Sequence, residues 1–233
     1  GEFGVFIDWC SLYQQPRTEE EEAAFTRSLA NISFWYASSS TIKLLLAAPP
    51  AGPSYDERGW PCYEKLAATL ITSSTNVLDL RHLTEDCETF ESMRSCCQVR
   101  RCPPLLPDAF DQLLDTKRFS FDSTDRPMVK QIYKYTFHNV FANVEVLDLS
   151  GLKWGDAEVQ QLAQVLGHCP ALCKLALTDN QIGDVGIVAL AQALPQSLQI
   201  LDLVDNGVGT AGAAALAEAL PNLQNLQQLY LSL

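Results

Sequence analysis

The sequence is poor in positive charge and has no apolar run long enough to cross a membrane. Its 233 residues include 16 Lys and Arg against 28 Asp and Glu, which gives a formal net charge of −12. A surface this acidic repels nucleic acid and anionic membranes, so we expect neither as a partner. The longest apolar candidate, residues 41–50, falls well short of the ~20 residues that a membrane-spanning helix needs. No membrane span is predicted, and proteins are the expected partners.

Signals of secretion and of phosphate binding are also absent. The chain starts with Gly-Glu-Phe and continues directly into an apolar stretch, without a signal peptide. No glycine-rich phosphate loop occurs, and no cofactor is expected. A chain of this length and apolar content does not need disulfides to fold. We therefore predict free thiols in a reducing, intracellular and cytoplasmic location.

The eight cysteines include a cluster that resembles a metal-binding arrangement only loosely. Cys87, Cys96, Cys97 and Cys102, together with His82, could surround a zinc ion. However, the spacing lacks the paired C-x-x-C of structural zinc sites. Free thiols or one disulfide are favoured, and no metal is predicted. The three histidines have no Ser or Cys partner at a motif spacing, so no hydrolase triad is predicted either.

The first 102 residues alternate between strand-like and helix-like stretches, which indicates a parallel sheet. Thr18 is the expected N-cap of the first helix, because the acidic residues that follow it suit a helix N-terminus. Residues 1–102 are accordingly assigned to a small α/β domain. Strands are expected at 5–7, 41–47 and 76–80, and helices at 19–37 and 63–70. One buried face of the first helix is predicted from the spacing of Phe25, Leu29, Ile32, Trp35 and Tyr36.

A helical connector is predicted between this domain and the rest of the chain. Residues 103–142 read as two helices, 108–116 and 127–141, with Pro127 in the first turn of the second. We expect this connector to cap the segment that follows. Three prolines mark its beginning: Pro103, Pro104 and Pro107.

From residue 143 to residue 233 the sequence repeats itself. Leu-x-Leu pairs begin at Leu147, Leu175, Leu201 and Leu229, at spacings of 28, 26 and 28 residues. A unit of one strand, one turn and one helix cannot bury its own apolar face, so stacked units merge their faces into one core. Each complete unit should place an Asn where it can hydrogen-bond turn backbone, and a Gly in a turn with unusual backbone angles. The residues concerned are Asn180 and Asn206, and Gly183 and Gly209.

This pattern resembles the ribonuclease-inhibitor-like class of leucine-rich repeats, which also occurs in NOD-like receptors. The resemblance implies a short horseshoe, with parallel strands on the concave side, helices on the outside, and binding of proteins to the concave face. The overall prediction is an α/β protein with this horseshoe after the small domain and the connector. The motif that carries the resemblance is Leu172-x-x-Leu175-x-Leu177-x-x-Asn180-x-Ile182-Gly183-x-x-Gly186.

Residues that alternate with the buried leucines should point outward from the sheet. Among them Tyr230 is a residue type favoured in interface hot spots. The sequence stops at Leu233 inside a strand, so we also expect association through this uncapped end of the sheet. The predicted partner-binding residues are Asp148, Lys174, Thr178, Ile200, Asp202, Val204, Gln228 and Tyr230.

A second resemblance concerns the N-terminal part. The segment 58–64, with the apolar run at 5–7 and the helix that ends in Trp35-Tyr36-Ala37, resembles TIR domains and the related HET domains. In TIR domains a Trp precedes, by four residues, the Glu implicated in cleaving NAD, and Trp60 and Glu64 stand at this spacing. The resemblance implies that Glu64 holds the ribose and stabilises the positive charge that develops as nicotinamide leaves. The chain departs from the family at Pro61, where a Cys is usual, and in the absence of the expected upstream strand and phosphate-side loop.

Two functions follow from these observations. The favoured one is a non-catalytic scaffold that binds a protein partner through the concave face of its repeats. The alternative is a TIR-like hydrolase that cleaves NAD through Glu64 and is regulated by its repeats.

Overall fold

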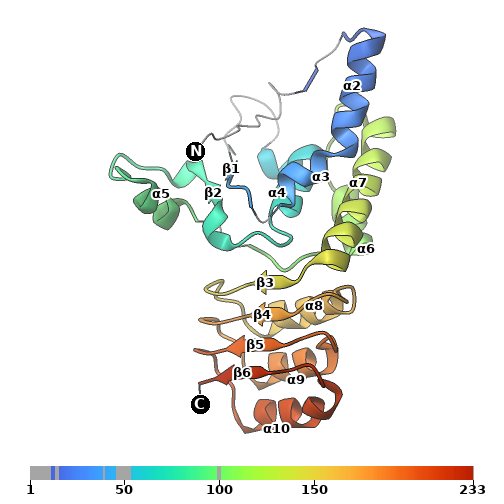
Figure 1. Cartoon of the computed structure of the whole chain (residues 1–233). Helices are drawn as coiled ribbons and strands as arrows, with labels where there is room; N and C mark the ends of the chain where they lie inside the picture. Colours follow the sequence, from blue (N-terminus) through green and yellow to red (C-terminus); the bar gives the residue numbers. More distant parts are fainter. Residues whose placement is uncertain (1–11, 14–15, 39, 46–53, 99–100, 233) are drawn as a thin grey trace.

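The computed structural model describes residues 12–13, 16–38, 40–45, 54–98 and 101–232. Within these ranges the chain forms two parallel sheets, a small one near the N-terminus and a larger one that carries the C-terminal repeats (Figure 1). The predicted α/β class with parallel strands is confirmed. The small sheet pairs β1 (Lys43–Leu45) with β2 (Val77–Asp79), and the larger has the order β3 (Val146–Asp148), β4 (Lys174–Ala176), β5 (Ile200–Leu203), β6 (Gln228–Leu231).

The first predicted helix is divided in two. Thr18 caps α2 (Glu19–Ala30) with a complete capping box, as expected from the sequence. The helix then ends, because Asn31 leaves the helical conformation and its side chain donates to the Arg27 carbonyl at 2.8 Å. A short second helix, α3 (Ile32–Tyr36), follows.

This break changes which apolar side chains are buried. Ile32 is in the core, but Trp35 is 51% exposed, so its predicted place on the buried face was wrong. A continuous helix from 19 to 37 would have aligned the two residues on one side. The interruption at Asn31 removes that alignment.

The remaining N-terminal elements are a second helix, the two-stranded sheet and several short elements. The second predicted helix begins earlier than expected, as α4 (Gly59–Ala68). In β1, Lys43 and Leu45 are buried while Leu44 is 52% exposed. The strand expected at 5–7 lies outside the described residues. Elements without a sequence-based prediction are α5 (Phe90–Cys97) and the short 3₁₀ turns η1 (Tyr55–Glu57), η2 (Ser74–Asn76) and η3 (Leu80–His82).

Two helices form the connector, α6 (Pro107–Asp115) and α7 (Asp122–Asn143). The sequence predicted Pro127 in the first turn of this helix. This was wrong: α7 begins at Asp122, so Pro127 lies in the second turn, inside the helix. Acidic residues at the start of α7 favour this earlier beginning. The proline removes one backbone hydrogen bond near the helix start.

The connector packs through aromatic side chains. The ring of Tyr133 on α7 stacks on Phe110 of α6 at a centroid distance of 3.7 Å, and its hydroxyl donates to the Leu105 carbonyl at 2.8 Å. Helix α7 also contacts α4 and leads directly into β3 (Figure 1). As a result one continuous cluster of buried side chains extends from Ile32 to Leu216. The predicted domain boundaries, at residues 102 and 142, both fall between residues of this shared core. The division into three domains remains a prediction.

The repeats stack as the period predicts. Leu147 pairs with Leu175, Leu175 with Leu201 and Leu201 with Leu229, all in parallel register. The helices α8, α9 and α10 follow their strands in turn, and α9 packs against both neighbours (Figure 1). The predicted ladder of leucines is therefore confirmed. The helices span Asp156–Leu166, Asp184–Ala193 and Thr210–Ala219, and a 3₁₀ turn η4 (Leu220–Asn222) follows the last.

The two asparagines bind the turn backbone, as predicted. Asn180 accepts from the Trp154 N–H at 3.0 Å and donates to the carbonyls of Leu149 and Leu177 at 2.9 and 2.8 Å. Asn206 repeats this pattern one unit later, accepting from the Ile182 N–H at 3.1 Å. Each asparagine therefore joins its own turn to the turn of the preceding unit.

The predicted role of the turn glycines was wrong. Gly183 and Gly209 have φ angles of −97° and −101°, which side chains adopt without strain. The left-handed conformation lies earlier in each turn, at Gly151, Asp179 and Asp205, with φ between 54° and 68°. These three residues occupy the same place in successive units.

Close approach explains the glycines instead. An oxygen of Asp156 accepts from the N–H groups of Gly183 and Gly186, at 2.7 and 2.9 Å. A Cβ at Gly186 would lie 2.7 Å from that oxygen, which leaves no room for a side chain. Asp184 binds Gly209 and Gly212 of the next unit in the same way. Asp156 and Asp184, the first residues of α8 and α9, thus cap the starts of α9 and α10.

Candidate functional site: the concave face of the repeat sheet

Two rows of side chains cross the face of the repeat sheet that is predicted to be concave. The strand register places one residue from each of the four strands in a row, so neighbours in a row come from neighbouring repeats. Val146 is 54% exposed and Tyr230 is 44% exposed, at opposite ends of the sheet. The first row is Val146, Lys174, Ile200 and Gln228, and the second is Asp148, Ala176, Asp202 and Tyr230.

The two aspartates of the second row are held in the same way. Asp148 accepts from the Ser150 N–H at 3.1 Å, and Asp202 accepts from the Val204 N–H at 3.2 Å. Ala176 lies between them, and its side chain is too short to separate them. Two strand spacings place the aspartates ~10 Å apart. The result is a pair of fixed carboxylates on one face.

The last strand contributes an aromatic side chain. The Tyr230 hydroxyl donates to Gln228 at 3.1 Å, which links the ends of the two rows. Behind it, Leu229 and Leu231 are only partly buried, whereas Leu201 on the neighbouring strand is fully buried. This edge of the sheet is the place where the sequence predicts further association, and that association remains a prediction.

A buried arginine lies behind the other end of the second row. Arg101 is 3% exposed and donates to the carbonyls of Thr69 and Thr72. Burial lowers the pKa of Arg101 to about 10, and the Asp148 carboxylate opposes that shift. On the face of the sheet, Asp148 is exposed and Asp202 is partly buried.

Thr178 and Val204 lie just past the ends of β4 and β5 and are both partly exposed. They continue the sheet face beyond the two rows. All eight residues predicted as partner-binding positions therefore lie on β3 to β6 or within two residues of a strand end. Their role in binding remains a prediction.

The residues of the predicted NAD site face different neighbours. The Trp60 indole N–H donates to Asp125 on α7 at 3.3 Å. One turn later on α4, Glu64 is partly buried and accepts from the Tyr55 hydroxyl at 3.4 Å. Trp60 therefore helps to attach α4 to α7, while Glu64 binds the turn that precedes its own helix.

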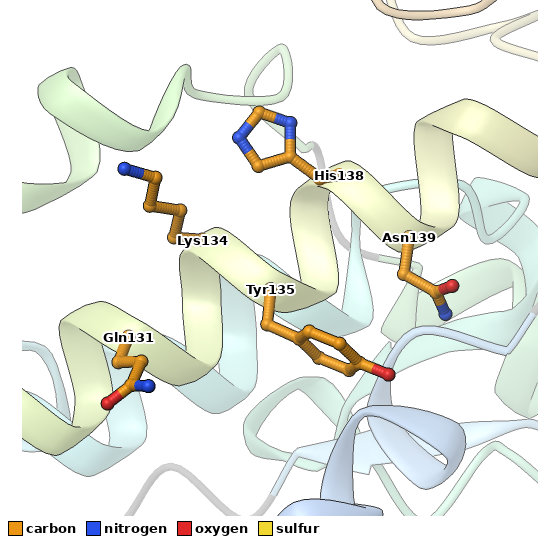
Figure 2. A pocket seen from close by; sticks show the side chains of 5 residues that line it. All are labelled: Gln131, Lys134, Tyr135, His138 and Asn139. Atoms are coloured by element: carbon orange, nitrogen blue, oxygen red, sulfur yellow. The ribbon is translucent and has the colours of Figure 1, made fainter.

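A surface pocket lies on one face of α7, away from both sites (Figure 2). Its lining comes from a single helix, and the side chains of Tyr135 and His138 stand on that helix in Figure 2. The lining residues are Gln131, Lys134, Tyr135, His138 and Asn139. Among the residues that the structure describes, no group of three or more His, Cys, Asp or Glu could hold a metal ion. None of the described helices is both long and apolar enough to cross a membrane.

Sequence reasoning missed the aspartates that join successive helices. Asp156 and Asp184 are 28 residues apart and each follows a glycine of the repeat, so the period could have indicated them. It also missed the contact of Trp154 with Arg101, whose carbonyl accepts from the Trp154 indole at 2.9 Å. No sequence pattern joins these two residues.

A model of the leucine-rich repeat family matches residues 168–191 and 195–217. The C-terminal segment of this chain thus consists of leucine-rich repeats, in agreement with its strands and helices.

Among solved structures, one described as Leiomodin-1 Actin-Binding Site 2 is similar, with a TM-score of 0.37 and 18% identity. The match covers 44% of this chain and 61% of that chain, so this chain spans less than two thirds of that structure. A similarity of this size does not indicate what this chain binds. No curated protein sequence matches significantly.

Proposed function

We propose that this chain binds a protein partner through the concave face of its leucine-rich repeats, without catalysing a reaction. The observation that carries the proposal is the pair of in-register rows across β3 to β6. Side chains in such rows present one continuous surface on a rigid backbone. Binding to a surface of this kind requires little reordering, which favours affinity.

The chemistry of the rows indicates a partner with a basic side chain flanked by apolar ones. Asp148 and Asp202 offer two fixed carboxylates, and the net charge of −12 attracts a basic partner at long range. Ile200 and Tyr230 supply apolar contact area beside them. An arginine of the partner between the two aspartates would match this arrangement.

Photo-crosslinking from the concave face identifies such a partner. In one variant a photoreactive phenylalanine replaces Tyr230. In the matched control it replaces Tyr135, which lies on α7 and is 60% exposed. We expect one basic protein to be crosslinked from position 230 and not from position 135. Equal crosslinking from both positions would contradict the proposal.

Binding of the purified partner then tests the residues by calorimetry. We expect Tyr230→Ala to weaken binding by roughly 30-fold, as for an interface hot spot of about 2 kcal/mol. Asp202→Lys should weaken it by roughly 10-fold or more, with a smaller loss at high salt. The charge-matched control is Glu218→Lys on the exposed side of α10, which should stay within about twofold of the original affinity.

We further propose that the repeats are of the ribonuclease-inhibitor-like class. Support comes from the spacing of 26 to 28 residues and from a full α-helix after β3, β4 and β5. This class places its binding surface on the strands.

The NAD-cleaving alternative depends on Glu64 and has a direct test. Under the scaffold proposal we expect no nicotinamide to be released when the chain is incubated with NAD, as followed by liquid chromatography. Release that is lost in Glu64→Gln, with the fold retained by circular dichroism, would replace the scaffold proposal by the TIR-like one. The matched control for such a loss is Glu57→Gln, an exposed carboxylate on η1.

A further inference from the structure

Two histidines from separate elements meet on the surface of the protein. His138 belongs to α7, and His168 lies two residues after the end of α8 in the first repeat. Their ring centroids are 5.8 Å apart, and the ring planes are inclined at 58°. Both residues are exposed, so ions in solution can reach them. The His138 ring projects from the face of α7 that lines the surface pocket (Figure 2).

A buried phenylalanine holds both imidazole rings in place. Phe137 is fully buried, and its ring contacts the ring of His138 at a centroid distance of 5.5 Å and that of His168 at 5.3 Å. Both contacts are edge-to-face, an arrangement that aromatic rings favour at such distances. The two imidazoles are therefore close together before any ligand binds, which lowers the cost of binding one.

We propose that His138 and His168 together bind one divalent transition-metal ion of the zinc type. A zinc ion binds an imidazole nitrogen at ~2.0–2.1 Å, so each ring centroid would lie ~3.2 Å from the ion. Two rings on a tetrahedral ion then have centroids ~5.2 Å apart, and a wider angle at the ion extends this to at most ~6.4 Å. The observed 5.8 Å lies within this range, so a small rotation of the exposed side chains is enough.

The chemistry of the ligands selects the ion. Neutral imidazole suits Zn²⁺, Cu²⁺ and Ni²⁺, whereas Ca²⁺ and Mg²⁺ require oxygen ligands. With two protein ligands the coordination is completed by water, and the ion is bound less tightly than in a closed site of four residues. The net charge of −12 attracts a divalent cation at long range. Lys134, one turn before His138, adds an opposing charge that is exposed and screened by solvent.

A bound ion would join the connector to the repeats. Its two ligands come from α7 and from the turn after α8, which are brought together only in the folded chain. An ion that binds the folded chain in preference to the unfolded one stabilises it by mass action. The proposal is independent of partner binding and of NAD cleavage, because it involves neither the strands nor Glu64.

Calorimetric titration of the full-length chain with Zn²⁺ tests the pair. Exposed thiols are alkylated beforehand under native conditions, because thiolates compete for zinc. We expect one ion to bind, and His138→Ala or His168→Ala to weaken its binding by roughly 10-fold or more. The matched control is His82→Ala, which removes the third histidine, also exposed, and should stay within about twofold. Unchanged binding in both pair variants would overturn the proposal, and so would an equal loss in all three variants.

Nuclear magnetic resonance with Co²⁺ locates the ion without any substitution. This paramagnetic substitute for zinc broadens the signals of backbone amides near it. We expect signals next to His138 and next to His168 to broaden at the same Co²⁺ concentration, while those next to His82 remain sharp. Broadening at only one histidine of the pair would contradict the proposal. Because the chain is unaltered, this result does not depend on whether a variant folds.

Thermal unfolding tests whether the ion joins the two parts of the chain. Zn²⁺ at about ten times the Kd from calorimetry should raise the Tm of the alkylated chain by about 4 °C. This rise should disappear in His168→Ala and persist in His82→Ala. A Tm that Zn²⁺ leaves unchanged, or raises equally in His168→Ala, would show that the ion does not link α7 to the first repeat.

Discussion

Trp154→Ala is expected to lower the free energy of unfolding by roughly 4 kcal/mol, the largest effect of any single change considered. Trp154 is fully buried, and its indole N–H donates to the Arg101 carbonyl at 2.9 Å. The substitution leaves a cavity where the N-terminal part meets the first repeat, and it leaves that carbonyl without its donor. Urea unfolding followed by far-ultraviolet circular dichroism measures the loss, because this signal does not depend on tryptophan.

Two further variants separate the contributions at this site. Trp154→Phe keeps most of the volume and removes the indole N–H, so we expect it to cost about 1–2 kcal/mol. Trp35→Ala removes a tryptophan that is half exposed and should change stability by less than about 1 kcal/mol. A Trp154→Ala protein as stable as Trp35→Ala would show that the two parts do not depend on this contact.

Asn180→Ala is expected to destabilise the chain by roughly 3 kcal/mol, because it leaves several buried backbone groups unpaired. The Asn180 side chain is 8% exposed and binds the Trp154 N–H and the carbonyls of Leu149 and Leu177. These partners belong to two successive turns, so the loss affects the contact between repeats and the local turn alike. Urea unfolding measures the total loss in the free energy of unfolding. Hydrogen exchange at the backbone amides of Trp154 and its neighbours shows where the structure opens.

The equivalent residue of the next repeat is the matched control. Asn206 makes the same kind of bonds but is partly exposed, so water can replace some of them. We expect Asn206→Ala to cost about half as much as Asn180→Ala. Asn180→Asp should resemble Asn180→Ala, because a carboxylate cannot donate to the two carbonyls. An Asn180→Asp protein of normal stability would contradict this account of the bonds.

The repeats were largely predictable because their information is local and periodic. A Leu-x-Leu pair every 26 to 28 residues determines which side chains face the core, and the register of Leu147, Leu175, Leu201 and Leu229 follows from stacking identical units. The asparagine bonds were predictable for the same reason. The rows of the concave face follow from strand alternation alone.

The turn glycines show where this reasoning stops. A glycine in a turn usually indicates a left-handed conformation, but Gly183 and Gly209 have ordinary φ angles. What restricts these positions is a carboxylate from the preceding helix: a Cβ would lie 3.3 Å from an Asp156 oxygen at Gly183 and 2.8 Å from an Asp184 oxygen at Gly209. Sequence alone does not report such an approach, because it depends on how closely the helices stack.

The N-terminal part was less predictable, since its elements have no repeat to reinforce them. The break of the first helix at Asn31 depends on a side-chain bond to Arg27, and the early start of α7 placed Pro127 inside a helix. The contacts of Trp60 with Asp125 and of Glu64 with Tyr55 join residues that spacing does not relate.

The sequence by itself determined the repeat architecture, the inward and outward faces of its strands, and the acidic character of the surface. Those properties depend on composition and on periods of 2 and of 26 to 28 residues, which the chain carries locally. Only the tertiary structure decided that Trp154 joins the repeats to the N-terminal part, and that Asp156 and Asp184 bind the start of the next helix. These pairings bring together residues that are distant in the chain or separated by irregular segments, and it is the packing of the common core that places them.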